Sequence, residues 1–88
     1  MPVVKFYASL RKLAGAKEKM IAGNSIRAIL QNLAEEVPAL QLLTHSGNEL
    51  QVRVIVTLNG HTLDRETMLD VPVSEQDHIA IFPPISGG

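Results

Sequence analysis

Apolar and polar residues alternate near the start of the chain, which is typical of a strand with one buried face. The alternation covers residues 3–10 and predicts the first strand. Its core face would carry Val4, Phe6, Ala8 and Leu10. A connection with Gly15 follows, where a glycine can adopt positive φ. Residues 17–22 are predicted to return as a second strand, with Met20 pointing inward.

The apolar period then changes from two residues to about 3.6, which predicts an amphipathic helix. Its apolar stripe consists of Ile26, Ile29, Leu30, Leu33, Ala34 and Val37. Asn24 or Ser25 can cap the helix by accepting from its free N–H groups. Pro38 cannot continue the helical hydrogen bonding and is expected to end it. A short helical turn at residues 39–43 and a polar loop at residues 44–49 are predicted to follow.

A third strand is predicted over residues 52–58, where apolar side chains alternate strictly. The following Asn59-Gly60 pair predicts a tight turn, because both residues tolerate positive φ. A short strand at residues 61–63 completes this hairpin. Residues 64–73 are predicted to be irregular, since Pro72 excludes a central strand.

The last strand is predicted over residues 78–82, after a turn at residues 74–77. Ile79 and Ile81 would share one face of it. The order strand, strand, helix, strand, short strand, strand predicts the α+β class: one mixed sheet with one main helix packed across it. If the last strand lies beside the first, the two run parallel at the centre of the sheet.

The face of the sheet away from the helix is predicted to carry Tyr7, Ile55 and Phe82. Apolar residues grouped on an open face indicate a partner-binding surface. The alternative is a different register: a shift by one residue would turn Phe82 into the core.

Composition narrows the class of protein. With 88 residues, 45% of them hydrophobic and 19% charged, the chain suits one folded domain. The net charge is -1 and no basic stripe occurs, so nucleic acid is not an expected partner. The absence of cysteine excludes thiolate chemistry from this chain. We find no signal-peptide pattern and no membrane-spanning run, so a cytoplasmic protein is expected.

Side-chain chemistry is sparse. The histidines His45, His61 and His78 have no metal-binding spacing, so they are interpreted as surface residues and no metal site is expected. The carboxylates of the C-terminal half are interpreted as solvated loop charges, with Asp70 and Asp77 capping turns.

The end of the sequence is its most unusual stretch. It reads Phe82-Pro83-Pro84-Ile85-Ser86-Gly87-Gly88. Two prolines stop a strand and favour a stiff, extended exit. Two glycines without β-carbons can enter a channel too narrow for other residues. The alternative is an ordinary frayed terminus or linker.

This ending resembles that of the MoaD family, the small subunit of molybdopterin synthase and a ubiquitin-like sulfur carrier. Two weaker motifs are also similar, at residues 10–15 and 54–60. The resemblance covers essentially the whole chain. Thiamin-pathway carriers share the Gly-Gly end but usually lack Phe-Pro-Pro. Gln76-Asp77 departs from the Gly-Asp of many relatives.

The resemblance implies a β-grasp (ubiquitin-like) domain at residues 1–82 and an extended tail at residues 83–88. It implies that the Gly88 carboxylate is adenylated and becomes a thiocarboxylate, which donates sulfur to the cyclic pterin precursor in molybdenum cofactor biosynthesis. Ile85, Ser86 and Gly87 would enter the active site of the synthase large subunit. Phe82 would anchor the docking face, with Arg11 assisting, and Pro83 and Pro84 are also expected at the partner interface.

The partners implied are that large subunit and a ubiquitin-activating-type adenylating enzyme, in a hetero-oligomer. No cofactor would be bound, because the partner uses the ATP, and the catalytic side chains would belong to the partners. Two alternatives remain open. One is a sulfur carrier for tRNA thiolation or thiamin synthesis, or a ubiquitin-like protein modifier. The other is an interaction module with an inert Gly-Gly end.

Overall fold

A computed structural model describes residues 1–46 and 49–84 of the chain. The strands are β1 (Val3–Phe6), β2 (Glu18–Met20), β3 (His45–Ser46), β4 (Glu49–Leu50), β5 (Ile55–Leu58), β6 (His61–Thr62) and β7 (His78–Phe82). The helices are α1 (Leu10–Ala14), α2 (Ile26–Glu36) and α3 (Gln41–Thr44), with the 3-10 turns η1 (Pro38–Leu40) and η2 (Met68–Asp70).

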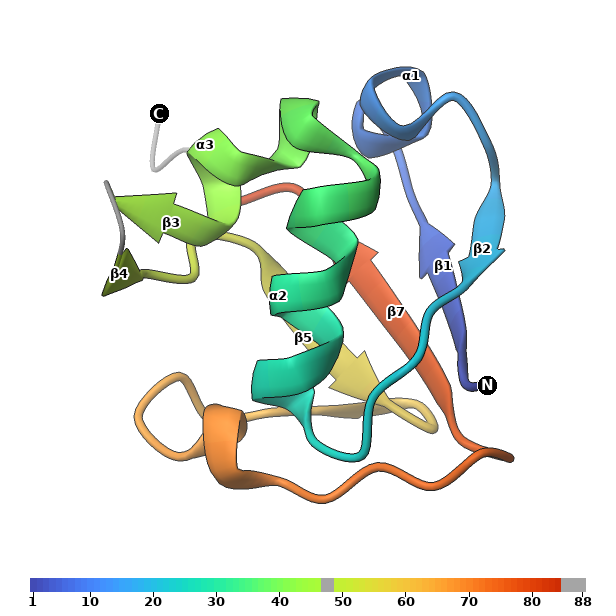
Figure 1. Cartoon of the computed structure of the whole chain (residues 1–88), viewed down its shortest axis with the longest axis vertical. Helices are drawn as coiled ribbons and strands as arrows, with labels where there is room; N and C mark the ends of the chain where they lie inside the picture. The colour runs from blue at the N-terminus through green and yellow to red at the C-terminus, as the bar shows by residue number, and fades with distance from the viewer. Residues whose placement is uncertain (47–48, 85–88) are drawn as a thin grey trace.

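Five strands form one mixed sheet in the order β2-β1-β7-β5-β6 (Figure 1). β7 lies at its centre and runs parallel to β1, while the other pairs are antiparallel. This confirms the predicted parallel pairing of the first and last strands. A separate two-stranded sheet joins β3 and β4.

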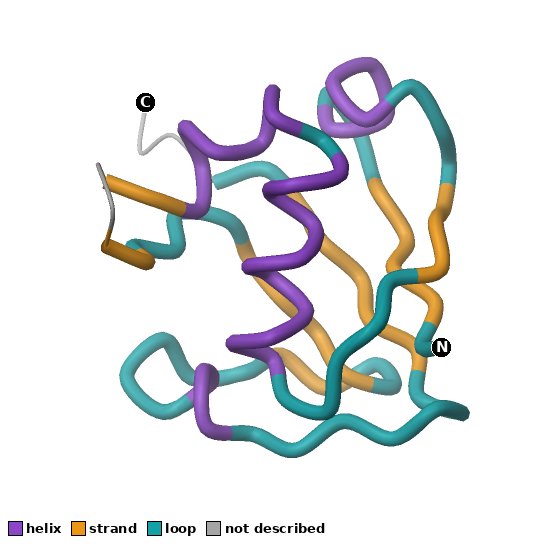
Figure 2. The backbone as a smooth tube through the Cα atoms, viewed as in Figure 1, coloured by secondary structure: helices purple, strands orange, loops and turns teal. Residues whose placement is uncertain are grey.

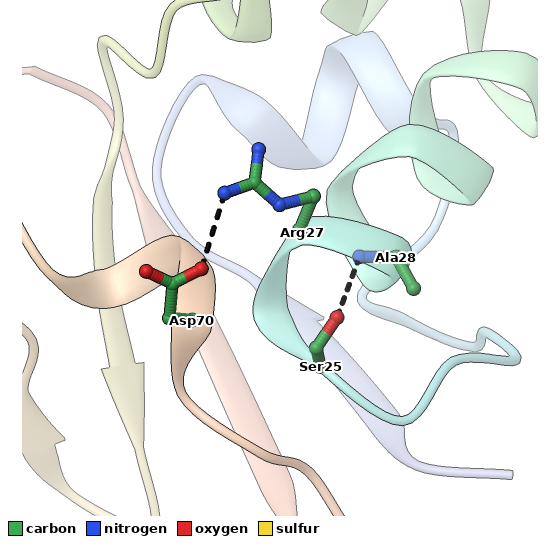
Figure 3. Close-up of polar contacts among 4 residues, drawn as sticks. All are labelled: Ser25, Arg27, Ala28 and Asp70. Carbon is green, nitrogen blue, oxygen red and sulfur yellow. Dashed lines mark hydrogen bonds and ion pairs between the residues drawn. The ribbon is translucent and has the colours of Figure 1, made fainter.

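Helix α2 packs across one face of the sheet (Figure 2). The Ser25 hydroxyl caps it, accepting a hydrogen bond from the N–H of Ala28 at 3.1 Å (Figure 3). Arg27, on the wet side of α2, forms an exposed ion pair with Asp70 at 3.2 Å. All six residues of the predicted stripe are buried, as are Val4, Phe6, Ile79 and Ile81 from the strands beneath. The predicted sheet with one main helix across it is therefore confirmed.

The first strand is shorter than predicted. It ends at Phe6, and Ala8 adopts φ 52°, which ends the extended backbone. The N–H of Leu10 then donates to the carbonyl of Tyr7 at 3.1 Å and α1 begins. The prediction that Ala8 points into the core was wrong, because the turn leaves it exposed, whereas Leu10 is buried.

The prediction that Met20 points inward was also wrong. Met20 pairs with Val3, on the face away from α2, and is 57% exposed. Ile21 follows the strand and enters the core instead.

Two further segments differ from the prediction. Residues 52–54 do not join the sheet, because the N–H of Arg53 donates to the carbonyl of Leu43. The predicted polar loop contains β3 and the first residue of β4. Thr44 at its start is buried, and its hydroxyl donates to the carbonyl of Leu40 at 3.1 Å. The loop's centre, residues 47–48, lies outside the described residues.

The Asn59-Gly60 turn is confirmed, with φ 50° and 87°. Asn59 also holds the start of β7, since its side-chain oxygen accepts from the N–H of His78 at 2.9 Å. The irregular segment after β6 supplies Met68, a fully buried core residue that no periodicity indicated.

Candidate functional site

The two faces of β7 have different surroundings. Ile79 and Ile81 are each 1% exposed beneath α2, whereas Ala80 and Phe82 on the opposite face are half-buried. This opposite face, which we call the open face, is the surface predicted to bind a partner.

An aromatic stack occupies one end of the open face. The rings of Tyr7 and Phe82 lie 4.6 Å apart at 13° to each other. The N–H of Tyr7 donates to the carbonyl of Ile81 at 3.2 Å, which extends the β1–β7 pairing by one residue. The backbone thereby places the two rings side by side in a stacked pair.

Arg11 also contacts this stack, over the Tyr7 ring. Its guanidinium carbon lies 5.4 Å from the centre of the Tyr7 ring, within range of a cation–π interaction. Its Nε donates to the carbonyl of Phe6 at 2.9 Å, which fixes the side chain over the ring. The turn at Ala8 makes this possible, because it starts α1 and so brings Arg11 back over Tyr7.

Ile55 completes the apolar end of the face. It is the register partner of Phe82 on β5 and is half-buried. The structure therefore brings together four of the residues that the sequence singled out for the interface, from β5, β7, the β1–α1 turn and α1.

The open face is hollowed along β7. A depression of about 540 Å³ runs from Tyr7 and Phe82 toward His78 and the Asn59-Gly60 turn. Lys5 also lines it. Neither Lys5 nor His78 was predicted to belong to the interface, although alternation along the first and last strands places both on this face.

The chain leaves β7 at the aromatic end. Pro83 is half-buried and Pro84 is exposed. The remaining predicted site residues, Ile85, Ser86, Gly87 and Gly88, lie outside the described residues.

Outside the open face, the ionisable side chains of the described residues are dispersed and do not form a candidate catalytic site. Residues 1–46 and 49–84 contain no group of three side chains placed to hold a metal ion. Asp77 caps its turn, because its carboxylate accepts from the N–H of Ser74 at 2.8 Å. This bond, and a second from the Asn59 amide, lower the pKa of Asp77. The chemistry that the described residues of the open face offer is therefore binding of an apolar surface.

The fold defines the class: this is a β-grasp, ubiquitin-like protein. The profile of the ThiS family matches residues 4–88, and the chain belongs to this family of ubiquitin-like sulfur carriers. Such small carriers are not typically catalytic.

Solved structures agree with this assignment. The small archaeal modifier protein 1 (SAMP1) of Methanosarcina acetivorans is 30% identical, with a TM-score of 0.84 over 99% of this chain and 95% of that one. SAMP1 from Haloferax volcanii is 27% identical, with a TM-score of 0.75 over 99% and 98%.

A third structure shows the fold alone. A Pyrococcus furiosus protein provisionally described as molybdopterin converting factor subunit 1 is 21% identical, with a TM-score of 0.74 over 96% and 97%. No functionally curated protein is similar enough to count as a match. None of the helices in the described part of the chain has the length and hydrophobicity to cross a membrane.

Proposed function

We propose that this chain is the sulfur carrier subunit of a molybdopterin synthase, with Gly88 as its terminal residue and reactive group. The observation that carries the proposal is the aromatic stack of Tyr7 and Phe82 directly before Pro83-Pro84. It connects a recognition surface to the tail that carries the chemistry.

The chemistry requires an activated acyl group. The Gly88 carboxylate attacks the α-phosphorus of ATP on the adenylating partner and displaces pyrophosphate. A protein persulfide then displaces AMP, and a thiol reduces the resulting acyl disulfide to the thiocarboxylate. None of these steps needs a side chain of this protein, which agrees with a site built for docking.

Delivery of the sulfur uses the same two parts. The open face holds the large subunit, while Ile85, Ser86 and Gly87 thread toward its active site. There the thiocarboxylate sulfur attacks the pterin precursor, and two such carriers supply the two sulfur atoms of the dithiolene. Small residues at the end of the tail suit a narrow channel.

Intact-mass spectrometry tests the first half of this proposal. The full chain is incubated with an adenylating enzyme, ATP and a sulfur donor, and a gain of ~16 Da for OH replaced by SH is expected. A variant with one alanine added after Gly88 should stay folded and gain nothing. A wild-type chain that forms no adenylate and gains no mass would contradict the proposal.

A second function is favoured by the similarity to SAMP1, whose name describes a modifier protein. In that case the activated Gly88 would form an amide with a lysine of another protein. The two functions can be distinguished by offering the carrier with its activated C-terminus either the synthase large subunit with pterin precursor or a lysate. Dithiolene product supports the synthase role, and conjugates of higher mass support the modifier role.

A further inference from the structure

A second hollowed surface lies at the edge of the molecule, beside the segment that joins β2 to α2. Two hollows of about 340 and 720 Å³ share Met1, Ala22 and Asn32 in their walls. The two hollows are therefore adjacent and have these residues as a common wall, and we call the pair of hollows the edge trough.

The edge trough exposes flexible apolar side chains. Met1 is 54% exposed and Met20 is 57% exposed, and both contribute to its walls. Methionine is unbranched and polarisable, so it adapts to partner side chains of different shapes. Exposed methionines in a hollow are therefore suited to receive the apolar residues of another chain.

The charges around the edge trough are mainly negative. Glu35 and Glu36 line one end, Glu75 lines the other, and all three are exposed. No lysine or arginine lines either hollow, although the α-amino group of Met1 lies in the wall. Among residues 1–46 and 49–84, only the carboxylate of Asp70 forms an ion pair. The three glutamates of the edge trough are therefore available to a cationic ligand.

The wall between the two hollows is held in place by local contacts. The Asn32 amide donates to the carbonyl of Ala22 at 2.7 Å. Gly23 has φ 153°, and a β-carbon there would lie 2.9 Å from the backbone nitrogen of Ile29. The segment therefore lies directly against α2, and the edge trough is formed before any partner binds.

The edge trough and the aromatic stack lie on different sides of the sheet, because Glu35 and Glu36 of α2 line the trough whereas Phe82 is on the face of β7 away from α2. Val3 is the register partner of His78, so Met1 and Glu75 lie near the start of β7, whereas Phe82 is at its end. Four residues of a strand separate His78 from Phe82 by roughly 13 Å. A protein seated on the stack leaves the edge trough accessible.

We propose that the edge trough binds a basic, apolar peptide segment of a partner protein, and that it can do so while the aromatic end of the open face is engaged. The occupant is identified by charge complementarity with Glu35, Glu36 and Glu75, and by the two exposed methionines. This interaction does not depend on the sulfur chemistry. It would keep the carrier attached to one protein while its other end exchanges partners.

The test is an NMR titration of the ¹⁵N-labelled full chain with a synthetic amphipathic peptide of leucine and lysine. Shift changes are expected at Ala22, Asn32 and Glu75, and not at Tyr7 or Ala80. A peptide with glutamate in place of lysine should not bind. The double variant Glu35→Gln/Glu36→Gln should bind the basic peptide roughly five-fold more weakly at low salt.

The matched control is Glu49→Gln/Glu66→Gln, which removes the same charge from exposed positions outside the walls. It should bind like wild type, and both double variants should keep the wild-type amide spectrum. Three outcomes would overturn the proposal: shifts centred on the open face, equal weakening by both double variants, or no binding. A concentration-dependent shift of Ala22 and Asn32 without peptide would overturn it in favour of a second copy of the chain.

Discussion

The two faces of β7 share one backbone and differ in what covers them. Ile79 and Ile81 are sealed beneath α2, whereas Ala80 and Phe82 face the hollow that Tyr7 and Lys5 also line. Because successive side chains of a strand point to opposite faces, one strand can stabilise the fold and present a binding surface. Loss of a side chain should therefore appear as instability on one face and as weak binding on the other.

The largest effect is expected on the covered face. Ile81→Ala leaves a cavity in a core that closes only partly around it, so the free energy of unfolding should fall by about 3–4 kcal/mol. Urea denaturation followed by circular dichroism measures it. The matched control is Ile55→Ala on the open face, expected to cost about 1 kcal/mol because the residue is only half-buried. Equal losses of unfolding free energy in Ile81→Ala and Ile55→Ala would contradict the distinction between the two faces.

On the open face, Phe82→Ala should weaken binding of the synthase large subunit by about 2 kcal/mol, or roughly thirty-fold. The cost in stability should be only about 1 kcal/mol, since the stack with Tyr7 is partly exposed. Isothermal titration calorimetry measures the affinity. Thr62→Ala is the control, because it shortens an exposed side chain on the same face, at the β6 edge and outside the hollows. Unchanged affinity in Phe82→Ala would remove the docking role from the stack.

A smaller effect of opposite sign, a gain in stability, is expected at the turn that positions Arg11. Ala8 has φ 52°, which strains any residue with a β-carbon. Ala8→Gly should therefore raise the free energy of unfolding by about 0.5–1 kcal/mol. Ala39→Gly, in the exposed turn η1, should lower it by about the same amount. A loss of stability in Ala8→Gly would mean that the turn is not strained in solution.

Ala8 also illustrates what the sequence could predict. The main helix and β7 were predicted correctly because their periodicity is local and continuous. The end of β1 was not, because alternation continues through Ala8 while the backbone turns. The stack of Arg11 on Tyr7 depends on that turn, so residue types alone could only suggest a role for Arg11.

The other differences come from contacts between distant segments. Met20 is outward because the register of β2 is fixed by β1, and residues 52–54 leave the sheet because the N–H of Arg53 bonds to the carbonyl of Leu43 in α3. Met68 fills the core from a segment without periodicity. For the open face, alternation was sufficient to group Ile55 and Phe82, but the hollow with Lys5 and His78 required knowledge of which strands are neighbours.

The smallest effect on stability is expected at the start of β7, in the turn that Asp77 caps. The N–H of Ser74 and the amide of Asn59 lower the pKa of Asp77 below its ordinary 3.8. The charged carboxylate therefore stabilises the folded state above pH 3.8, and this contribution is lost as the pH falls through the lowered pKa. Urea midpoints measured between neutral and strongly acidic pH should fall less in Asp77→Asn than in wild type. Glu75→Gln, the neighbouring exposed carboxylate, should follow wild type. If Asp77→Asn also follows it, the turn does not depend on this charge, and the start of β7 is held by the two hydrogen bonds between Asn59 and His78, one of them from the Asn59 N–H to the His78 carbonyl and the other from the His78 N–H to the Asn59 side-chain oxygen.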